Sequence, residues 1–199
     1  MSYSKYTLRT ITEPATEPVT LAEAKLWCRI DDDDTAQDAM VLVMIQAMRR
    51  YAENYTRRAY VSRTLQMRLW GFPEHCIRLP FAPLQSVTSI TYIDSNGSTQ
   101  TLDGSPSLYQ WDTASEPGVV MPVYNDTWPT TRYDLDSVRI TYTCGYASQS
   151  LIPANLKLWM QARISTLNEN REQLIRNNMV NIPRDFADGL LDSLIVDLF

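Results

Sequence analysis

The chain has little of what most catalytic sites use. Its 199 residues include one histidine and six glycines. Any histidine-dependent mechanism therefore rests on His75 alone. Its neighbour Cys76 would point to the opposite face of an extended segment, which places the two poorly as base and nucleophile. The sequence also lacks a glycine-rich phosphate loop, a nucleophile elbow and an HExxH motif. These absences predict a protein that is not an enzyme and that binds no cofactor.

Cysteine is scarce as well, and its three copies are Cys28, Cys76 and Cys144. An odd and scattered set forms no disulfide framework, which is typical of a protein made in a reducing cytoplasm. Together with His75 these residues reach the ligand count of a Cys3His zinc site. No Cys-x-x-Cys pair is present, however, and the spacings match no structural zinc pattern. We therefore expect no metal site.

Long hydrophobic runs and excess positive charge are also missing. The longest apolar run, Ala39 to Ile45, is far shorter than the roughly 20 residues that a membrane span requires. The first residues have no apolar core like that of a signal peptide, so neither secretion nor membrane association is expected. A net charge of −5 argues against a protein that grips nucleic acid through a basic face. It is compatible with a protein that surrounds DNA without gripping it.

An acidic run, Asp31 to Asp34, resembles a calcium loop at first sight. A calcium loop needs glycine at its sixth position and glutamate at its twelfth, and no register that starts in this run provides them. We therefore interpret the run as a solvated helix entry. A cation site shared between subunits is the alternative.

Local signals for structure begin before this run. Thr20 and Glu23 have the spacing of a capping box, in which each side chain accepts a hydrogen bond from the backbone N–H of the other residue. Pro18 keeps the residue before it extended. These signals predict a first helix from about Leu21 to Ile30.

A second helix is expected from about Ala36 to Arg58, with Asp34 or Thr35 as its cap. Its apolar residues form two neighbouring stripes at helical spacing. They are Val41, Ile45, Met48, Ala52 and Tyr55 in one stripe, and Met40, Met44, Ala47 and Tyr51 in the other. Because the apolar surface is so wide, we expect this helix to be covered on more than one side.

The middle of the chain is expected to form strands. Apolar and polar residues alternate from Leu65 to Leu69 and from Val138 to Tyr142, as they do in half-buried strands. Asp94 to Gly97 is a strong hairpin turn signal. Further strands are expected at residues 87–93, 99–102 and 108–111. The stretch from Thr113 to Ser137 is weakly patterned, and we expect a long loop that is functional or held by a partner.

The chain then returns to helix, because apolar residues from Leu156 to Leu167 keep helical spacing after Pro153. The expected fold class is α+β, with an N-terminal helix pair and C-terminal helices forming a helical bundle and with an inserted antiparallel β region. The expected divisions are residues 1–63 for the N-terminal helical part, 64–146 for the β region, 147–183 for the C-terminal helix that completes the bundle, and 184–199 for an amphipathic C-terminal arm.

The arm follows an asparagine-rich break, and its apolar residues fall largely on one face. They are Phe186, Leu190, Leu191, Leu194, Ile195, Leu198 and Phe199. Two interpretations remain open. The segment is either a last helix packed on its own domain or an arm that lays its apolar face into a groove on a partner. The polar break before it provides the tether that an arm requires.

Several stretches, in their order along the chain, resemble the head–tail connector (adaptor) proteins of tailed double-stranded DNA bacteriophages and prophage-like elements. The opening from Glu17 to Lys25 and the helix pair resemble the start and the helix pair of that family. The similar stretches that follow are Ser62 to Thr64, Ile77 to Pro80, Pro83 to Val87, Tyr92 to Asp94, Thr141 to Tyr146, Ile152 to Pro153 and Asn170 to Glu172. Each piece is short, but their combined order covers nearly the whole chain.

This resemblance implies a structural virion protein, made in the host cytoplasm and located in the neck between head and tail. Such proteins form a homo-oligomeric ring, commonly of twelve copies, beneath the portal protein. The ring extends the DNA channel, lets double-stranded DNA pass without specific binding, and offers a surface to a neck or tail-completion protein. C-terminal segments of the family often reach the portal, so the apolar residues of the arm are the expected portal contacts. Trp128, Tyr133 and Tyr124 are the candidate contacts to a neighbouring subunit or to the tail side.

Two other functions are alternatives to the connector. A β-rich carbohydrate-binding or tail-tip binding module would use Trp70, Trp111 and Trp128, and exposed coplanar aromatic rings would favour it. An enzyme with an acid pair would need a deep pocket that holds two carboxylates. The order of motifs favours the connector.

Overall fold

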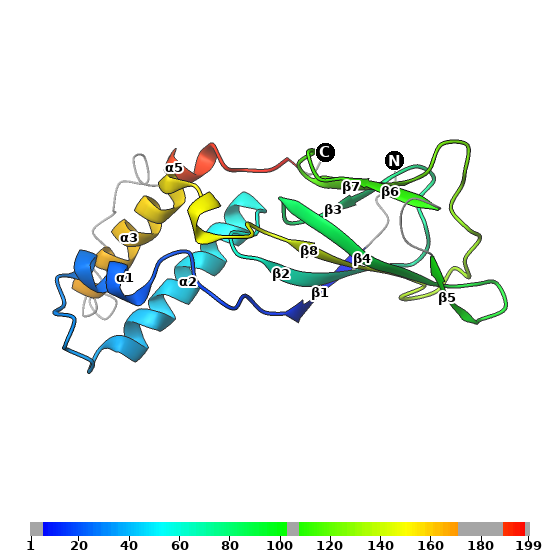
Figure 1. The fold of residues 1–199 in the computed structure, drawn as a ribbon. Helices are drawn as coiled ribbons and strands as arrows, with labels where there is room; N and C mark the ends of the chain where they lie inside the picture. The colour runs from blue at the N-terminus through cyan, green and yellow to red at the C-terminus, as the bar shows by residue number, and fades with distance from the viewer. Residues whose placement is uncertain (1–5, 103–107, 171–188, 198–199) are drawn as a thin grey trace.

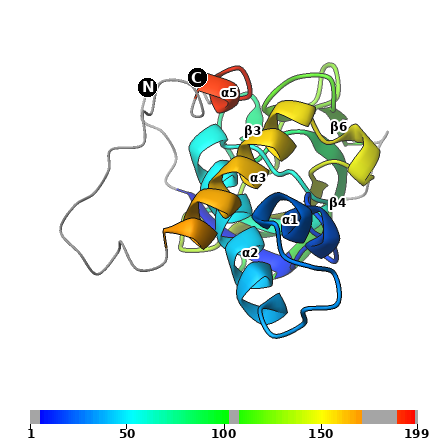
Figure 2. The same cartoon turned by 90° about the vertical axis from the view of Figure 1, so that its left-hand side faces the viewer.

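The computed structural model describes residues 6–102, 108–170 and 189–197, and these residues have an α+β architecture (Figure 1). Helices pack together at one end of the molecule and two antiparallel sheets form the other (Figures 1 and 2). The helices are α1 (Leu21–Cys28), α2 (Asp38–Thr56), α3 (Ala154–Glu169) and α5 (Gly189–Asp192), with a 3-10 turn η1 (Gln149–Leu151) before α3. The expected fold class is therefore confirmed.

The larger sheet has its strands in the order β1-β2-β8-β4-β5, and the smaller sheet has the order β3-β7-β6. Every pairing in both sheets is antiparallel. The strands are β1 (Tyr6–Thr12), β2 (Arg63–Leu69), β3 (Ile77–Leu79), β4 (Leu84–Ile93), β5 (Thr99–Leu102), β6 (Tyr109–Asp112), β7 (Gly118–Pro122) and β8 (Val138–Cys144). The central strands that the alternating pattern predicted are present.

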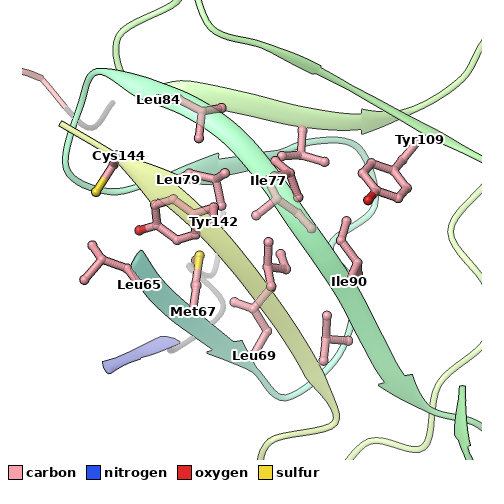
Figure 3. Close-up of a cluster of buried hydrophobic side chains, with 14 of the residues drawn as sticks. Leu65, Met67, Leu69, Ile77, Leu79, Leu84, Ile90, Tyr109, Tyr142 and Cys144 are labelled. Atoms are coloured by element: carbon pink, nitrogen blue, oxygen red, sulfur yellow. The ribbon is translucent and has the colours of Figure 1, made fainter. Parts of the chain in front are cut away.

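The first hydrophobic core lies between the two sheets (Figure 3). Alternate residues of β2 and β8 point into it, which is why the period of two was visible in the sequence. The sheets approach closely where β7 crosses β4. A side chain on Gly118 would come within 2.5 Å of the Leu84 Cβ atom, so this crossing requires glycine. Gly97, with a φ of 86°, closes the expected hairpin turn, and its N–H donates to the Asp94 carbonyl.

Three strands, β1, β3 and β7, lie where no strand was predicted. β1 occupies part of the N-terminal zone that was expected to be helical, and β7 lies inside the expected loop from residue 113 to 137. Most side chains of β1 are exposed, so it has no buried face to produce alternation. It is a strand because its backbone pairs with β2. β7 is short and ends at a proline, and its pairing with β3 and β6 holds it.

The capping box is confirmed at the start of α1. The Thr20 N–H donates to Glu23 Oε2 at 2.7 Å, and the Glu23 N–H donates to Thr20 Oγ1 at 3.2 Å. The bond from the Thr20 N–H to the carboxylate, together with one from the Thr20 hydroxyl at 2.9 Å, lowers the pKa of Glu23. The helix ends at Cys28, two residues before the expected end, because Arg29 takes a left-handed conformation with φ 56°.

The expected cap of α2 was wrong. The helix begins at Asp38 behind Gln37, and no side chain caps it. Asp34 instead accepts a hydrogen bond from the Ala36 N–H at 3.1 Å, which forms a turn before the helix. The local Asx turn therefore displaces the helix start by two residues.

A second hydrophobic core lies among the helices. It combines buried residues of α1, α2, α3 and α5 with residues of the connecting loops. α2 buries Val41, Ile45 and Ala52 against this core, but its other face is open: Val43 and Tyr51 have 64% and 53% of their surface exposed. Within the described residues, α2 is therefore covered on one side only, whereas its wide apolar surface predicted cover on more than one side.

A chain of buried charges connects the helices to the larger sheet. Glu53, at the end of α2, is 2% exposed, and its Oε2 atom lies 3.0 Å from both Arg49 Nη1 and Arg63 Nη1. Arg49 in turn lies 2.7 Å from Glu17. Glu53 also accepts a hydrogen bond from the Tyr60 N–H at 3.3 Å. Because Arg63 begins β2, this network links the entry to α1, the end of α2 and the first central strand.

We expect Glu53→Gln to lower the free energy of unfolding by about 3 kcal/mol, since it leaves a buried arginine without its counter-charge. Urea unfolding followed by circular dichroism measures the change. Glu74→Gln, at an exposed position, is the matched control and should stay within about 0.5 kcal/mol of the unmodified chain. Equal stabilities of the two variants would contradict the role given to this network.

Candidate interaction surfaces

The described part of the C-terminal segment, residues 189–197, lies against the chain's own helices (Figure 1). Leu191 is fully buried in the helical core, and Leu190 and Leu194 pack against that core. Ile195 is different, because 41% of its surface is exposed. The other candidate portal contacts, Phe186, Leu198 and Phe199, lie outside the described residues.

Hydrogen bonds fasten this segment to α2, to α3 and to the residues after α2. They run from Tyr55 Oη to Asp192 Oδ1 (2.8 Å), from Asn155 Nδ2 to the Leu190 carbonyl (3.0 Å), from the Val196 N–H to the Thr56 carbonyl (2.9 Å) and from Arg58 Nε to the Leu194 carbonyl (3.1 Å). In the isolated chain the segment is therefore part of the helical bundle.

Arg58 does more than hold this segment. Its Nη1 and Nη2 atoms each donate to an oxygen of Glu116 at 2.6 Å, a bidentate pair with a residue of the β6–β7 loop. One guanidinium group thus joins the C-terminal segment, the end of α2 and the smaller sheet. Sequence reasoning missed this residue, and no local signal was available, because Glu116 and Leu194 lie far away along the chain.

The three aromatic candidates do not form one surface. Trp128 is half-buried: its ring stacks on Phe72 with centroids 4.7 Å apart, and its Nε1 donates to the His75 carbonyl at 2.9 Å. Tyr133 and Tyr124 are 80% and 97% exposed and are free to contact a partner. Their role at an interface stays a prediction, while Trp128 has a clear structural role.

A flat aromatic platform is not formed by these side chains. Tyr133 lies edge-on to Trp70, with an angle of 82° between the rings. Trp111 is half-buried and packs against the core between the sheets. Trp70, Trp111 and Trp128 therefore lack the exposed coplanar arrangement on the sheet that would favour the carbohydrate-binding alternative.

The cysteines lie in three different parts of the molecule. Cys28 is half-buried at the helical core, Cys76 is exposed beside His75, and Cys144 is buried between the sheets (Figure 3). Burial raises the pKa of Cys144 to about 12, which keeps it a neutral thiol. Within residues 6–102, 108–170 and 189–197, no group of three or more His, Cys, Asp and Glu side chains is placed to hold a metal ion. No helix in these same ranges is both long and apolar enough to cross a membrane.

The acidic run surrounds a cation that the protein supplies itself. Lys25 is 3% exposed, and its Nζ atom donates to the carbonyls of Asp32 and Asp34 at 2.8 and 2.9 Å and lies 3.1 Å from Asp38 Oδ1. The carboxylates of Asp31 to Asp33 belong to exposed residues, as expected for a solvated run. The ammonium group of Lys25 therefore orders the loop between α1 and α2.

Comparisons with known proteins decide between the functions that the sequence left open. Residues 18–104, from the start of α1 through β5, match the model of a family described as phage gp6-like head–tail connector protein. This part of the chain belongs to the phage gp6-like head–tail connector family. It is therefore a structural protein and not an enzyme. A head–tail connector joins the head of a phage-like particle to its tail, so this connector belongs in the neck.

Solved structures share the fold of this connector over nearly its whole length. A chain from the neck of an empty GTA particle, computed with C6 symmetry, has a TM-score of 0.79 and 19% identity. A chain from the virion of a native gene transfer agent (GTA) particle has a TM-score of 0.78 and 20% identity. A third chain, from the neck of a native GTA particle computed with C12 symmetry, has a TM-score of 0.73 and 17% identity. Each match covers 97% of both chains. No curated protein matches the connector.

We expect Lys25→Met to lower the free energy of unfolding by about 2 kcal/mol, because it leaves two carbonyls and a carboxylate without their donor. Arg50→Met, which removes a charge from an exposed position of α2, is the control and should have little effect. Thermal unfolding of the unmodified connector should be the same with calcium and with a chelator. A rise in melting temperature with calcium would show that the loop binds a metal after all.

Proposed function

We propose that this connector assembles as a closed ring beneath the portal protein, with twelve copies as the expected number. The ring extends the DNA channel and offers its far side to a neck or tail-completion protein. Family membership carries this proposal. The similarity over 97% of the chain to proteins from GTA necks, solved with C6 and C12 symmetry, supports it. Contacts between two different faces of one protein, repeated by rotation, produce such rings.

The charge of the connector suits a channel through which DNA slides. A net charge of −5 provides no excess of lysine and arginine for phosphate contacts. DNA that is repelled weakly by the wall of a channel moves without being held. The connector therefore passes double-stranded DNA and does not bind it specifically.

The C-terminal segment is the proposed portal contact. Among its described apolar residues, Ile195 is the one whose side chain is exposed in the isolated chain. Leu191 and Val196 are buried, so their transfer to a portal groove requires their segment's hydrogen bonds with Thr56, Arg58 and Asn155 to break first. We infer that Ile195 makes the first contact and that the rest of the segment follows, together with Phe186, Leu198 and Phe199.

Mixing the purified connector with its portal tests the ring directly. Negative-stain electron microscopy and mass measurement should show a connector ring stacked on the portal, and the mass gives the copy number. A connector that remains a folded monomer in the presence of its portal would overturn the proposal.

Ile195→Asp tests the portal contact. We expect the variant to bind the portal at least tenfold more weakly, since a charge replaces an apolar contact, while its melting temperature stays close to that of the unmodified connector. Ile11→Asp is the matched control, because Ile11 is 49% exposed on β1 at the sheet end of the molecule. Biolayer interferometry on immobilised portal measures both affinities. Equal binding by the two variants would show that Ile195 does not touch the portal.

A further inference from the structure

The open face of α2 carries a continuous apolar stripe. Its members are spaced four residues apart along the helix and are Ala39, Val43, Ala47, Tyr51 and Tyr55. All five are exposed, with exposed fractions of 64% for Val43, 53% for Tyr51 and 42% for Tyr55. Single apolar residues on a surface are ordinary, but a stripe along a 19-residue helix is the pattern of a helix face that another element covers.

The stripe is also preorganised for contact. The rings of Tyr51 and Tyr55 stack with an angle of 8° between them, and Tyr51 stacks on Trp159 of α3 with centroids 5.6 Å apart. Tyr55 is held further by its hydrogen bond to Asp192. Fixed aromatic rings lose little entropy when a partner covers them, and the two alanines let another helix approach closely.

A second apolar patch lies on a different helix of the bundle. Leu26 and Trp27, at the end of α1, are 77% and 42% exposed. Figure 2 shows α1 and α2 as two separate helices beside α3, so the patch and the stripe belong to different helices of the bundle. One protomer therefore presents two separate apolar faces, which is what a head-to-tail contact between copies requires.

The charges beside the two patches are opposite in sign. Arg50 and Arg57 are exposed on the outer side of α2, and residues 39–57, all of them described, include no exposed carboxylate. Beyond the α1 patch lie the exposed Asp31, Asp32 and Asp33, offset in part by Arg29. Opposite charges at the rim of an interface favour this pairing over a contact between two identical faces.

We propose that the α2 stripe of one connector copy binds the Leu26–Trp27 patch of the next copy and that this contact closes the ring. The proposal rests on the ring assembly of the proposed function and names the surfaces that build it. Repetition of one heterologous contact around an axis also explains why the described residues of one chain cover neither patch.

Two charge substitutions test the two faces. Val43→Glu and Leu26→Glu are each expected to weaken the contact between copies by about 100-fold or more, because a charge would be buried without a partner. Neither variant should then form a ring on the portal. Leu135→Glu, at a residue that is 69% exposed in the loop before β8, is the matched control and should assemble as the unmodified connector does.

A mixture of the two variants separates a head-to-tail contact from a symmetric one. The Val43→Glu copy keeps an intact α1 patch and the Leu26→Glu copy keeps an intact α2 stripe, so the pair can form one contact and no more. Glutaraldehyde fixation followed by mass measurement should show heterodimers in the mixture and monomers for each variant alone. Absence of heterodimers would overturn the pairing of these two faces.

The outcomes also distinguish this inference from the proposed function. If the unmodified connector forms no ring on its portal, the ring proposal fails and this one fails with it. If the ring forms and Val43→Glu still assembles, only the assignment of the α2 stripe is wrong. A melting temperature of Val43→Glu more than about 5 °C below that of the unmodified monomer would show that the stripe is covered within its own chain, which would also overturn the inference.

Discussion

The Glu53 carboxylate, held between Arg49 and Arg63, is the contact on which the arrangement of this connector depends. The helices and the sheets have separate hydrophobic cores, and apolar packing alone does not orient one core relative to the other. The three charged side chains, each no more than 9% exposed, are by contrast stable in one geometry, because each leaves an uncompensated charge when it moves. The network therefore sets how the helical end, with its proposed contact surfaces, is presented relative to the sheets.

Arg58 repeats this arrangement at the C-terminal segment. Its guanidinium group connects Glu116 of the β6–β7 loop with the Leu194 carbonyl, so the segment is joined to both ends of the molecule. Of the two interpretations that the sequence left open, packing on the chain's own bundle describes the isolated chain. Portal contact remains a proposal. Docking would cost the free energy of the hydrogen bonds that hold the segment to its own chain. A segment that few hydrogen bonds hold to its own chain can leave that site and bind a groove on a partner.

Local chemistry explains where prediction from sequence succeeded. The capping box at Thr20 and Glu23 involves residues three apart, and the hairpin at Asp94 to Gly97 involves four consecutive residues, so both are visible without the fold. The central strands were visible because one face is buried. β1 was missed because both its faces are largely exposed, and the start of α2 was displaced because Asp34 bonds to the Ala36 N–H and not to the helix. The role of Lys25 in the loop was missed because its partners are mostly backbone carbonyls. Every residue has such a carbonyl, so the sequence does not show which ones a lysine will bind.

The sequence by itself determined the class of fold, the helix pair with its cap, the central strands and the resemblance to connector proteins, because each depends on local spacing or on the order of motifs. Only the tertiary structure decided which apolar faces are covered. The wide apolar surface of α2 predicted cover on more than one side, and the chain's described residues cover one side. The fold likewise brought Arg58 to Glu116 and buried Leu191 while leaving Ile195 exposed. Burial and pairing between distant residues depend on how the elements pack, and that information is absent from the spacing of residues along the chain.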